Sequence, residues 1–375
     1  MYSVTEIIQS IRKNHPPTHT LSLQFEDLPL AVHCNSLELY TFLAEYLHTF
    51  RAPFSSRTTT SITVHEGDPG LPELNWTVKP PEPGKAKIKE EFADLPDGRL
   101  IRKRQTGVVF ALADQEHLAV GPVTDNPNQI INFINNRFIQ HKLCRSCLLG
   151  HAAGISHNGR GMALAGFSGM GKSTLALHLM SSGCTFVSND RIMVEADTQR
   201  LTMYGVAKHP RINPGTALHN PDLAGLIPEE KREALAKRGD LWELEDKYDA
   251  PIETFFGPDR FVLGAPMDIL ILLNWAHDDQ PTHFQKVDLH ERTDLLPAFQ
   301  KAPGLFFWPS GNGDCRIIRP SQSNYLGYLS KCHVYEISGG VDFAAATEFC
   351  LDILNNAPLR SSREYACPQP APASL

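Results

Sequence analysis

The sequence has few of the features that mark membrane, nucleic-acid-binding or secreted proteins. Its longest apolar run, 267–275, falls far short of the roughly 20 residues that cross a bilayer. The N-terminal stretch 1–17 contains a glutamate and no apolar core, which predicts no signal peptide. The 35 Lys and Arg are outnumbered by 42 Asp and Glu, and the net charge of −7 disfavours a nucleic-acid partner. We therefore expect a cytoplasmic protein that binds neither membrane nor nucleic acid.

Cysteine is also scarce, because eight cysteines in 375 residues are too few for a disulfide scaffold. In a reducing compartment we expect them to be mostly buried thiols. His141, Cys144, Cys147 and His151 follow one another closely and form an alternative metal cluster. Structural zinc sites usually take their ligands from two separated segments, so buried thiols are the favoured interpretation of the two cysteines.

The first third of the chain predicts a small β-rich domain with helices, over 1–125. Val4, Ile7, Ile8 and Ile11 recur at helical spacing, which predicts a helix over 1–15. A second helix is expected over 36–50. Apolar, β-branched runs predict strands at 20–25, 28–33, 58–64, 99–112 and 118–123.

The remainder predicts an α/β domain over 126–360, followed by a disordered Pro- and Ala-rich tail over 361–375. A helix is expected from Pro127, because apolar residues follow it on one side. Strands are expected at 162–165, 185–187, 201–206, 269–273 and 334–337, with helices at 172–182 and 343–354.

The clearest motif is Gly166-Phe-Ser-Gly-Met-Gly-Lys172-Ser173, which matches the phosphate-binding pattern GxxxxGK[ST]. We call residues 166–173 the glycine loop. Its glycines let backbone N–H groups point at an anion, its lysine reaches the β- and γ-phosphates, and its serine hydroxyl can bind Mg²⁺. We predict that ATP is bound by Gly166, Ser168, Gly169, Met170, Gly171, Lys172, Ser173 and Thr174. A glycine-rich turn that binds no nucleotide is the alternative.

Two further segments supply candidate catalytic groups. Asp190 follows the strand at 185–187, which we expect to be a parallel neighbour of the strand before the glycine loop. It is the candidate base for an acceptor hydroxyl and a candidate metal ligand, with a turn or helix-cap role as the alternative. Lys208 and Arg211 follow the strand at 201–206 and are candidates to stabilise the transferred phosphoryl group. Solvated loop residues are the alternative there.

These residues resemble a known family. The region 128–275, and most strongly 148–195, resembles the HPr kinase/phosphorylase catalytic domain, in particular the HprK-related kinase B branch found beside an ATP-grasp protein in the GAK system. The resemblance implies an ATP- and Mg²⁺-dependent kinase that phosphorylates a protein serine. It implies a position near the transferred phosphate for His151, with a satisfied core histidine as the alternative. It also implies that Asp190 is the retained member of an acidic pair whose other position is Asn189. Glu243 is the implied further metal ligand, with Glu245 as its substitute.

We therefore expect a P-loop kinase domain of the HPr kinase and phosphoenolpyruvate carboxykinase type, preceded by a small β-rich α+β domain. The expected acceptor is a serine of a partner protein, either a small associated protein or an ATP-grasp neighbour, and the related kinases imply a homo-oligomer. A small-molecule hydroxyl is an alternative acceptor. Asn189 motivates a second alternative, a non-catalytic ATP-binding regulatory subunit. A motor or switch NTPase ranks lowest, because neither a second acidic strand motif nor a guanine-specifying motif is recognisable.

Overall fold

The computed structural model describes residues 2–14, 16–53, 60–81, 86–114, 116–241, 244, 246–276, 278–309, 315–356 and 365. The chain divides into two compact units. Unit 1 holds Met1–Ser146 and Pro303–Ile317, and unit 2 holds Cys147–Ala302 and Ile318–Leu375. The first unit thus extends to Ser146, whereas the predicted boundary between the two domains lies between residues 125 and 126. The predicted tail over 361–375 lies outside the described residues, except for Tyr365.

Unit 1 is built on a mixed sheet. Its helices are α1 (Val4–Asn14), α2 (Leu37–Tyr46), η1 (His48–Phe50) and α3 (Pro127–Leu143). Its strands are β1 (His19–Phe25), β2 (Leu28–Cys34), β3 (Thr60–Glu66), β4 (Thr77–Val78), β5 (Glu90–Leu95), β6 (Gly98–Lys103), β7 (Val109–Leu112) and β8 (Glu116–Gly121). The described strands follow the order β1-β2-β3-β8-β7-β6-β5-β4. β3 runs parallel to both β2 and β8, and the other neighbours are antiparallel.

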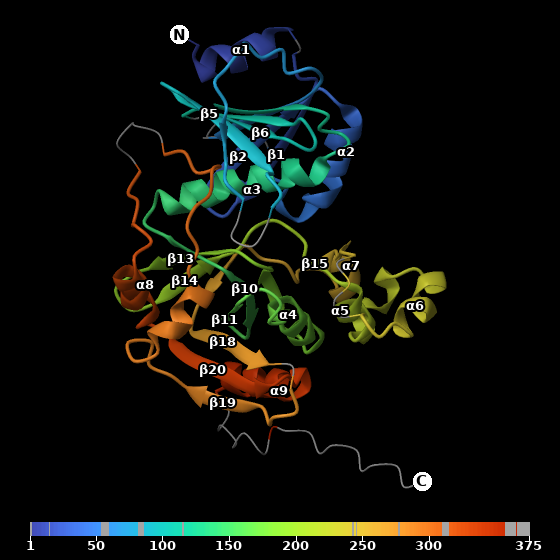
Figure 1. Ribbon diagram of the computed structural model, residues 1–375, viewed down its shortest axis with the longest axis vertical. Coiled ribbons are helices and arrows are strands. Elements are labelled where there is room, and N and C mark those ends of the chain that lie inside the picture. Colours follow the sequence, from blue (N-terminus) through green and yellow to red (C-terminus); the bar gives the residue numbers. More distant parts are fainter. Residues whose placement is uncertain are drawn as a thin grey trace. The chain divides into compact units, whose positions relative to one another are not determined.

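The two faces of this sheet bury different helices (Figure 1). On β7, Val109 and Ala111 pack in one cluster with all four predicted apolar residues of α1. Phe110, between them, points the other way and contacts Phe133 of α3 at a ring separation of 4.7 Å. This alternation is the two-residue period of a strand buried on both faces. Since α3 covers one face of this sheet, the helix predicted from Pro127 belongs to unit 1.

The predicted strand over 99–112 is wrong in one respect, because the chain reverses within it. β6 and β7 form an antiparallel hairpin in which Arg102 faces Val109. Gly107 makes the reversal possible, since its φ of 77° is a left-handed conformation that glycine adopts without steric cost. Its N–H donates to the carbonyl of Lys103 at 2.8 Å and closes the turn.

The N-terminus of α1 is capped from a distant position in the sequence. The Asp97 carboxylate accepts hydrogen bonds from the backbone N–H groups of Val4 and Thr5 at 2.7 and 2.9 Å, and from the Ser3 hydroxyl at 2.7 Å. Burial acts to raise the pKa of Asp97, but these hydrogen bonds outweigh it and hold the pKa well below its ordinary value of 3.8. Asp97 therefore joins α1 to the β5–β6 turn.

Replacing Asp97 by alanine should destabilise the protein by about 1–2 kcal/mol, the usual cost of losing a helix N-cap. Because the folded-state pKa is depressed, this stabilisation is complete above the ordinary carboxyl pKa and is lost as the pH falls below it. Asp94→Ala is the matched control, since Asp94 forms an exposed ion pair with Arg99 on the same hairpin. Urea unfolding at neutral and acidic pH measures both variants, and equal losses would contradict the capping role.

The segment 303–317 of unit 1 comes from the second half of the chain. Phe306 packs edge-on against Phe110 and Phe133, and the backbone N–H of Trp308 donates to the Gln140 side chain of α3 at 2.9 Å. Cys144 and Cys315 form a disulfide that closes this attachment. The prediction that Cys144 is a buried thiol is therefore wrong. The sequence separation of 171 residues hides the pairing from any local pattern.

Unit 2 combines two larger sheets with several helices. Its helices are α4 (Lys172–Ser181), α5 (Pro214–Leu218), η2 (Pro221–Leu226), α6 (Glu229–Ala236), α7 (Ile252–Phe256), η3 (Thr293–Ala298), α8 (Gln322–Leu329) and α9 (Phe343–Leu354). Its strands are β9 (Leu148–Gly150), β10 (Ala152–His157), β11 (Arg160–Gly166), β12 (Thr185–Ser188), β13 (Ile192–Ala196), β14 (Leu201–Tyr204), β15 (Arg211–Ile212), β16 (Tyr248–Asp249), β17 (Gly264–Pro266), β18 (Ile269–Ala276), β19 (His283–Lys286) and β20 (His333–Gly340). The expected mixed α/β architecture is confirmed for the described residues.

The main sheet of unit 2 has the described strand order β12-β10-β11-β18-β20-β19, with β11, β18 and β20 parallel. Leu270 and Leu272 of β18 face a core shared with the second sheet, which has the order β17-β14-β13-β9. Ile269, Ile271 and Leu273 face the opposite core, which α4 and α9 cover (Figure 1). A strand buried on both faces is apolar throughout, which explains the uninterrupted run at 269–273.

The position of β12 corrects one expectation. β12 is not the neighbour of β11, because β10 lies between them and pairs antiparallel with both. Two antiparallel steps restore the direction, so β11 and β12 still run the same way. Their carboxyl ends therefore lie at the same edge of the sheet, two strand spacings or roughly 10 Å apart. Asp190 follows β12 at this edge, where the glycine loop follows β11.

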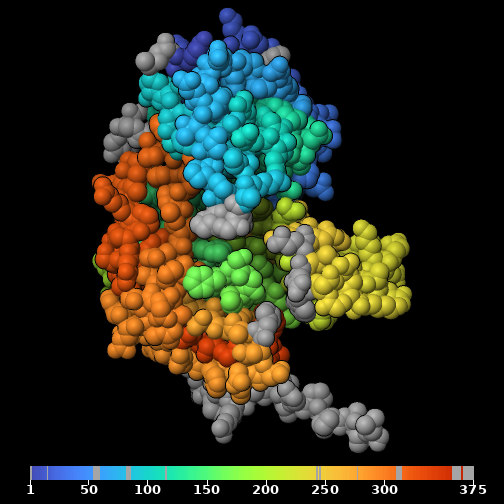
Figure 2. Space-filling model, in the orientation of Figure 1, coloured from blue at the N-terminus to red at the C-terminus, as the bar shows by residue number. Residues whose placement is uncertain are grey.

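Beyond the sheets, the α5–α6 region extends from unit 2. The yellow atoms of this region stand out at the right of Figure 2, and α6 has no buried residue. In the described part of the chain, no helix is long and apolar enough to span a membrane.

Candidate functional site

The glycine loop joins β11 to α4, and the predicted strand before it and helix after it are confirmed. Gly169 and Gly171 have φ angles of 87° and 74°, which are left-handed conformations that favour glycine. Gly171 is also the N-cap of α4, and a Cβ at this position would lie 2.6 Å from the Phe343 ring. Backbone geometry and packing thus both require glycine where the helix begins.

Lys172 lies across the loop that contains it. Its Nζ donates to the carbonyl oxygens of Gly166 at 2.6 Å and Phe167 at 3.1 Å, and the residue is only 8% exposed. Burial lowers the pKa of Lys172 to about 8, while Asp190 acts to raise it. A bound anion would add a charged partner to this ammonium, beside the positive N-terminal end of α4.

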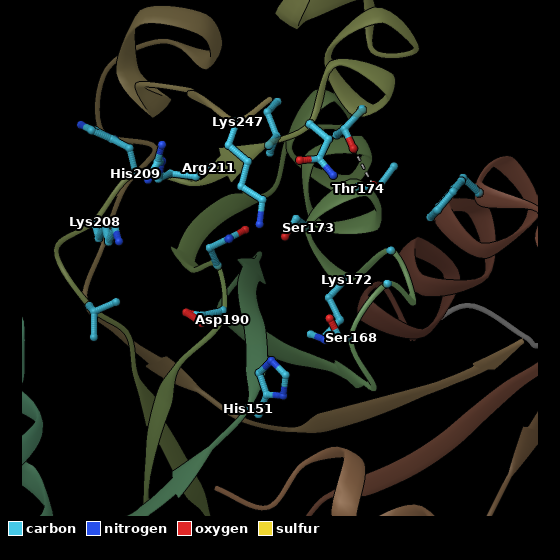
Figure 3. Close-up of a pocket in the computed structure, with 18 residues that line it drawn as sticks. His151, Ser168, Lys172, Ser173, Thr174, Asp190, Lys208, His209, Arg211 and Lys247 are labelled. Atoms are coloured by element: carbon cyan, nitrogen blue, oxygen red, sulfur yellow. Dashed lines mark hydrogen bonds between the residues drawn. The ribbon is translucent and has the colours of Figure 1, made fainter. Parts of the chain in front are cut away.

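The loop forms one side of a cleft of about 520 Å³, a size suited to a nucleotide (Figure 3). The cleft brings together most of the predicted site residues: His151, Ser168, Gly169, Gly171, Lys172, Ser173, Thr174, Asp190, Lys208 and Arg211. Gly166 and Met170 contribute backbone hydrogen bonds to the loop. The Gly166 carbonyl accepts from Lys172 Nζ, and the Met170 carbonyl accepts from Trp275 Nε1. The predicted metal ligand Glu243 and its substitute Glu245 lie outside the described residues.

Asp190 lies among the positive groups of the cleft. Its negative charge acts to raise the pKa values of Lys172, Lys208 and His151, so the carboxylate is within electrostatic reach of all three. Beside it, Asn189 also lines the cleft, and its Oδ1 is buried without a hydrogen-bond donor among the described residues. The same edge of the sheet thus carries a carboxylate, which can accept a proton, and an amide oxygen, which can accept a hydrogen bond; both oxygens can bind a hard cation.

His151 connects β9 to β10 and faces the cleft (Figure 3). Its backbone N–H donates to the carbonyl of Phe299 at 2.7 Å, which fixes the turn. Burial, followed by the charges of Lys172 and Lys301, lowers the pKa of His151 to about 4. The imidazole is therefore neutral near pH 7 and can accept a proton or donate a hydrogen bond without adding positive charge.

The opposite side of the cleft is basic, and we call Lys208, His209, Arg211 and Lys247 the basic wall. Burial lowers the pKa of Lys208, and His209 Nδ1 accepts a hydrogen bond from the Ile252 N–H at 3.3 Å. Arg211 is held by an ion pair, with its Nε 3.1 Å from Asp249 Oδ1. The pairing of β15 with β16 aligns these two residues and brings Lys247 to the cleft.

Sequence reasoning missed several lining residues, among them Lys247, Asn213, Thr216 and Phe343. Lys247 lies in a charge-dense segment that predicts a solvated surface, and the two-residue strand that positions it has no periodic signal. Thr216 shares a hydrogen bond of 2.9 Å with Thr174, which joins α5 to the start of α4. Asn213 and Pro214 were the available signal, since an asparagine N-cap followed by proline at the first helical position marks a helix start, here directly after the predicted cations.

The alternative metal cluster does not form. Cys144 is bonded to Cys315, His141 Nε2 lies 3.0 Å from Asp27 Oδ2, and His151 faces the cleft. No group of three or more His, Cys, Asp or Glu residues with metal-binding geometry occurs in the described part of the chain. Cys147 is a buried thiol, as predicted.

Anion binding in the cleft should weaken as the pH rises. Lys172 must be protonated to hold an anion, and with a pKa of about 8 it is mostly charged at pH 7 and mostly neutral at pH 9. The affinity for tripolyphosphate should therefore fall about tenfold over that interval. Loss of the proton from Lys208, whose pKa is also lowered, changes affinity in the same direction.

Lys172→Arg is the matched variant for this prediction, because a guanidinium keeps its charge over the whole interval. Calorimetric titration at the two pH values should give a flatter profile for the variant than for the unmodified chain. A tenfold loss in both proteins would assign the pH dependence to another group.

Comparison with known proteins gives likenesses to solved structures. No family model and no curated protein matches the sequence. Among solved structures, this chain is similar to the Hpr(Ser) kinase/phosphatase from Coxiella burnetii. The match covers 56% of this chain and 88% of the other, with 14% sequence identity and a TM-score of 0.29.

Proposed function

We propose that the protein is an ATP- and Mg²⁺-dependent kinase that transfers the γ-phosphate to a hydroxyl, namely a serine of a partner protein. One observation carries this proposal. The glycine loop with its buried Lys172 follows β11, and Asp190 follows β12, which runs in the same direction, and both line the same cleft. Phosphoryl transfer needs a cradle for the phosphates and a group that orients or deprotonates the acceptor.

The charge of the cleft supports a polyanionic ligand. Lys172, Lys208, Arg211 and Lys247 line it, whereas Asp190 is the one carboxylate among the described lining residues. Arg211 is partly neutralised by Asp249, and the other cations remain in excess over Asp190. A triphosphate complements this excess, and cations on both sides of the cleft can balance charge on the γ-phosphoryl oxygens during transfer.

The donor set suits a magnesium ion. The Ser173 hydroxyl, the Asp190 carboxylate and the buried Asn189 Oδ1 offer oxygen atoms, which are the ligands that Mg²⁺ prefers. When bound, the ion would neutralise phosphate charge in the cleft. Histidine and cysteine ligands, which favour softer metals, are not needed for this site.

In the proposed reaction, Asp190 accepts the proton of the acceptor hydroxyl as its oxygen attacks the γ-phosphorus. The bond from that phosphorus to the β,γ-bridging oxygen breaks, and ADP retains the electron pair. Lys172 holds the β- and γ-phosphates in place. His151 remains neutral and is available to hydrogen-bond the acceptor or a phosphate oxygen.

The test is transfer from γ-labelled ATP in a cell extract, followed by separation of protein from metabolites. A labelled protein band that depends on the added chain supports the proposed acceptor class. Label in the metabolite fraction alone would replace it with a small-molecule hydroxyl.

A second candidate is a regulatory subunit that binds ATP without turnover. Asn189 favours it, because an amide stands beside Asp190 where the resembling family has a second acid. Tight ATP binding without transfer to any fraction of the extract would select this function over the kinase.

A further inference from the structure

The cleft has one aromatic surface that the proposed chemistry does not use. Among the described lining residues, Phe343 is the one that carries a phenyl or indole ring, and its side chain is half-buried at the start of α9. The other lining residues are mostly polar or basic. A ligand that complements the cleft therefore combines an anionic chain with a flat, weakly polar group.

The Phe343 ring is held firmly in place. It packs edge-on against Trp275, with ring centroids 5.1 Å apart and an interplanar angle of 82°, and stacks on His178 at 5.8 Å and 26°. Trp275 in turn donates from Nε1 to the Met170 carbonyl at 3.0 Å. Because the neighbours fix the ring, a ligand that stacks on it pays little conformational entropy for ordering it.

The ring is also fixed relative to the phosphate cradle. It lies directly against Gly171, at the turn where the glycine loop becomes α4. A planar group on Phe343 would thus be separated from a phosphate at the loop by a short spacer only. A nucleoside triphosphate has this arrangement, since a ribose and the α-phosphate separate its base from the β-phosphate.

We propose that the base of the bound nucleotide stacks on Phe343, which makes this residue the base-stacking surface of the cleft. The inference rests on the proposed function, because it assumes that the glycine loop binds the triphosphate. Stacking on an aromatic ring tolerates any base, so the ring favours nucleotides over phosphate chains that lack a base.

The experiment compares two ligands of similar phosphate charge, ATP and inorganic tripolyphosphate, by calorimetric titration of the full chain with Mg²⁺. Phe343→Leu keeps apolar bulk against Gly171 and removes the ring. It should weaken ATP binding about 5- to 150-fold and leave tripolyphosphate within about twofold. Phe343→Tyr should retain ATP affinity, and Lys172→Ala should weaken both ligands.

Equal weakening of both ligands in Phe343→Leu would overturn the inference, because the ring would then act by supporting the loop. Unchanged ATP affinity would also overturn it and place the base elsewhere, while the proposed nucleotide site stands. If the unmodified chain binds neither ligand, the proposed function itself fails. Phe343→Trp gives a second readout: ATP should quench the added indole fluorescence and tripolyphosphate should not, whereas no quenching by ATP counts against stacking.

Discussion

Replacing Lys172 by alanine should reduce phosphoryl transfer about 100- to 1,000-fold or more, the cost of removing one preorganised group that stabilises transition-state charge. The lysine is buried in the loop and its Nζ already lies against the Gly166 carbonyl. Its charge is therefore positioned before the ligand arrives. No other cation among the described residues is placed within the loop itself, so the loss has no local substitute.

The fold should survive this change, because the side-chain hydrogen bonds of Lys172 go to carbonyls of its own loop. Thermal unfolding and circular dichroism check this point. Lys237→Ala is the matched control, since Lys237 is an exposed lysine directly after α6, paired with Glu233, and lies outside the cleft lining. It should retain full transfer activity. Full activity of Lys172→Ala in the labelled-ATP assay would refute the kinase proposal.

Replacing Asp190 by asparagine should reduce transfer about 100- to 10,000-fold while nucleotide binding persists. Asparagine has the same shape and can still accept a hydrogen bond, but it cannot take the proton of the acceptor hydroxyl. The expected signature is thus a loss in kcat at similar ATP affinity, whereas Lys172→Ala should impair binding as well. This contrast separates the chemical role from the phosphate-holding role.

The binding arm of this test should be run below pH 7. The Asp190 carboxylate acts to raise the pKa of Lys172, so its removal lowers that pKa further and would weaken anion binding at alkaline pH. Asp197→Asn serves as the control, because Asp197 is an exposed turn residue outside the cleft and asparagine can keep its turn hydrogen bonds. Unimpaired transfer by Asp190→Asn would remove Asp190 from the reaction and favour another base.

The side of the cleft formed by the glycine loop was predictable because its determinants are local. Residues 166–173 specify a turn, a helix start and a charge within one short segment, and the apolar runs on either side fix the strand and the helix. Asp190 was predictable for a related reason, since a strand that runs in the same direction as β11 must end at the same edge. The intervening β10 changed the spacing and left that edge unchanged.

The remaining features depend on contacts between distant segments. Lys247 reaches the cleft through the pairing of Arg211 with Asp249, which two short strands make without any repeating pattern. Phe343 starts a helix whose predicted bounds are confirmed, but its place beside Gly171 follows from how α9 packs with α4. Cys144 gives no local sign of its partner. The chemical role of a side chain was thus easier to predict than which helices, strands and loops distant in the sequence lie in contact.

The attachment of residues 303–317 to unit 1 has a consequence for how the chain is made. A ribosome releases the N-terminal end first, so the sheet of unit 1 emerges long before the segment that supplies Phe306 and Cys315. With 171 residues between the two cysteines, the delay is roughly 10 to 30 s at ordinary rates of synthesis. During this time Phe306 is absent, so the rings of Phe110 and Phe133 lack the side chain that packs on them in the complete chain. The glycine loop, in contrast, emerges within that interval, so nascent unit 2 can begin to fold before unit 1 is finished.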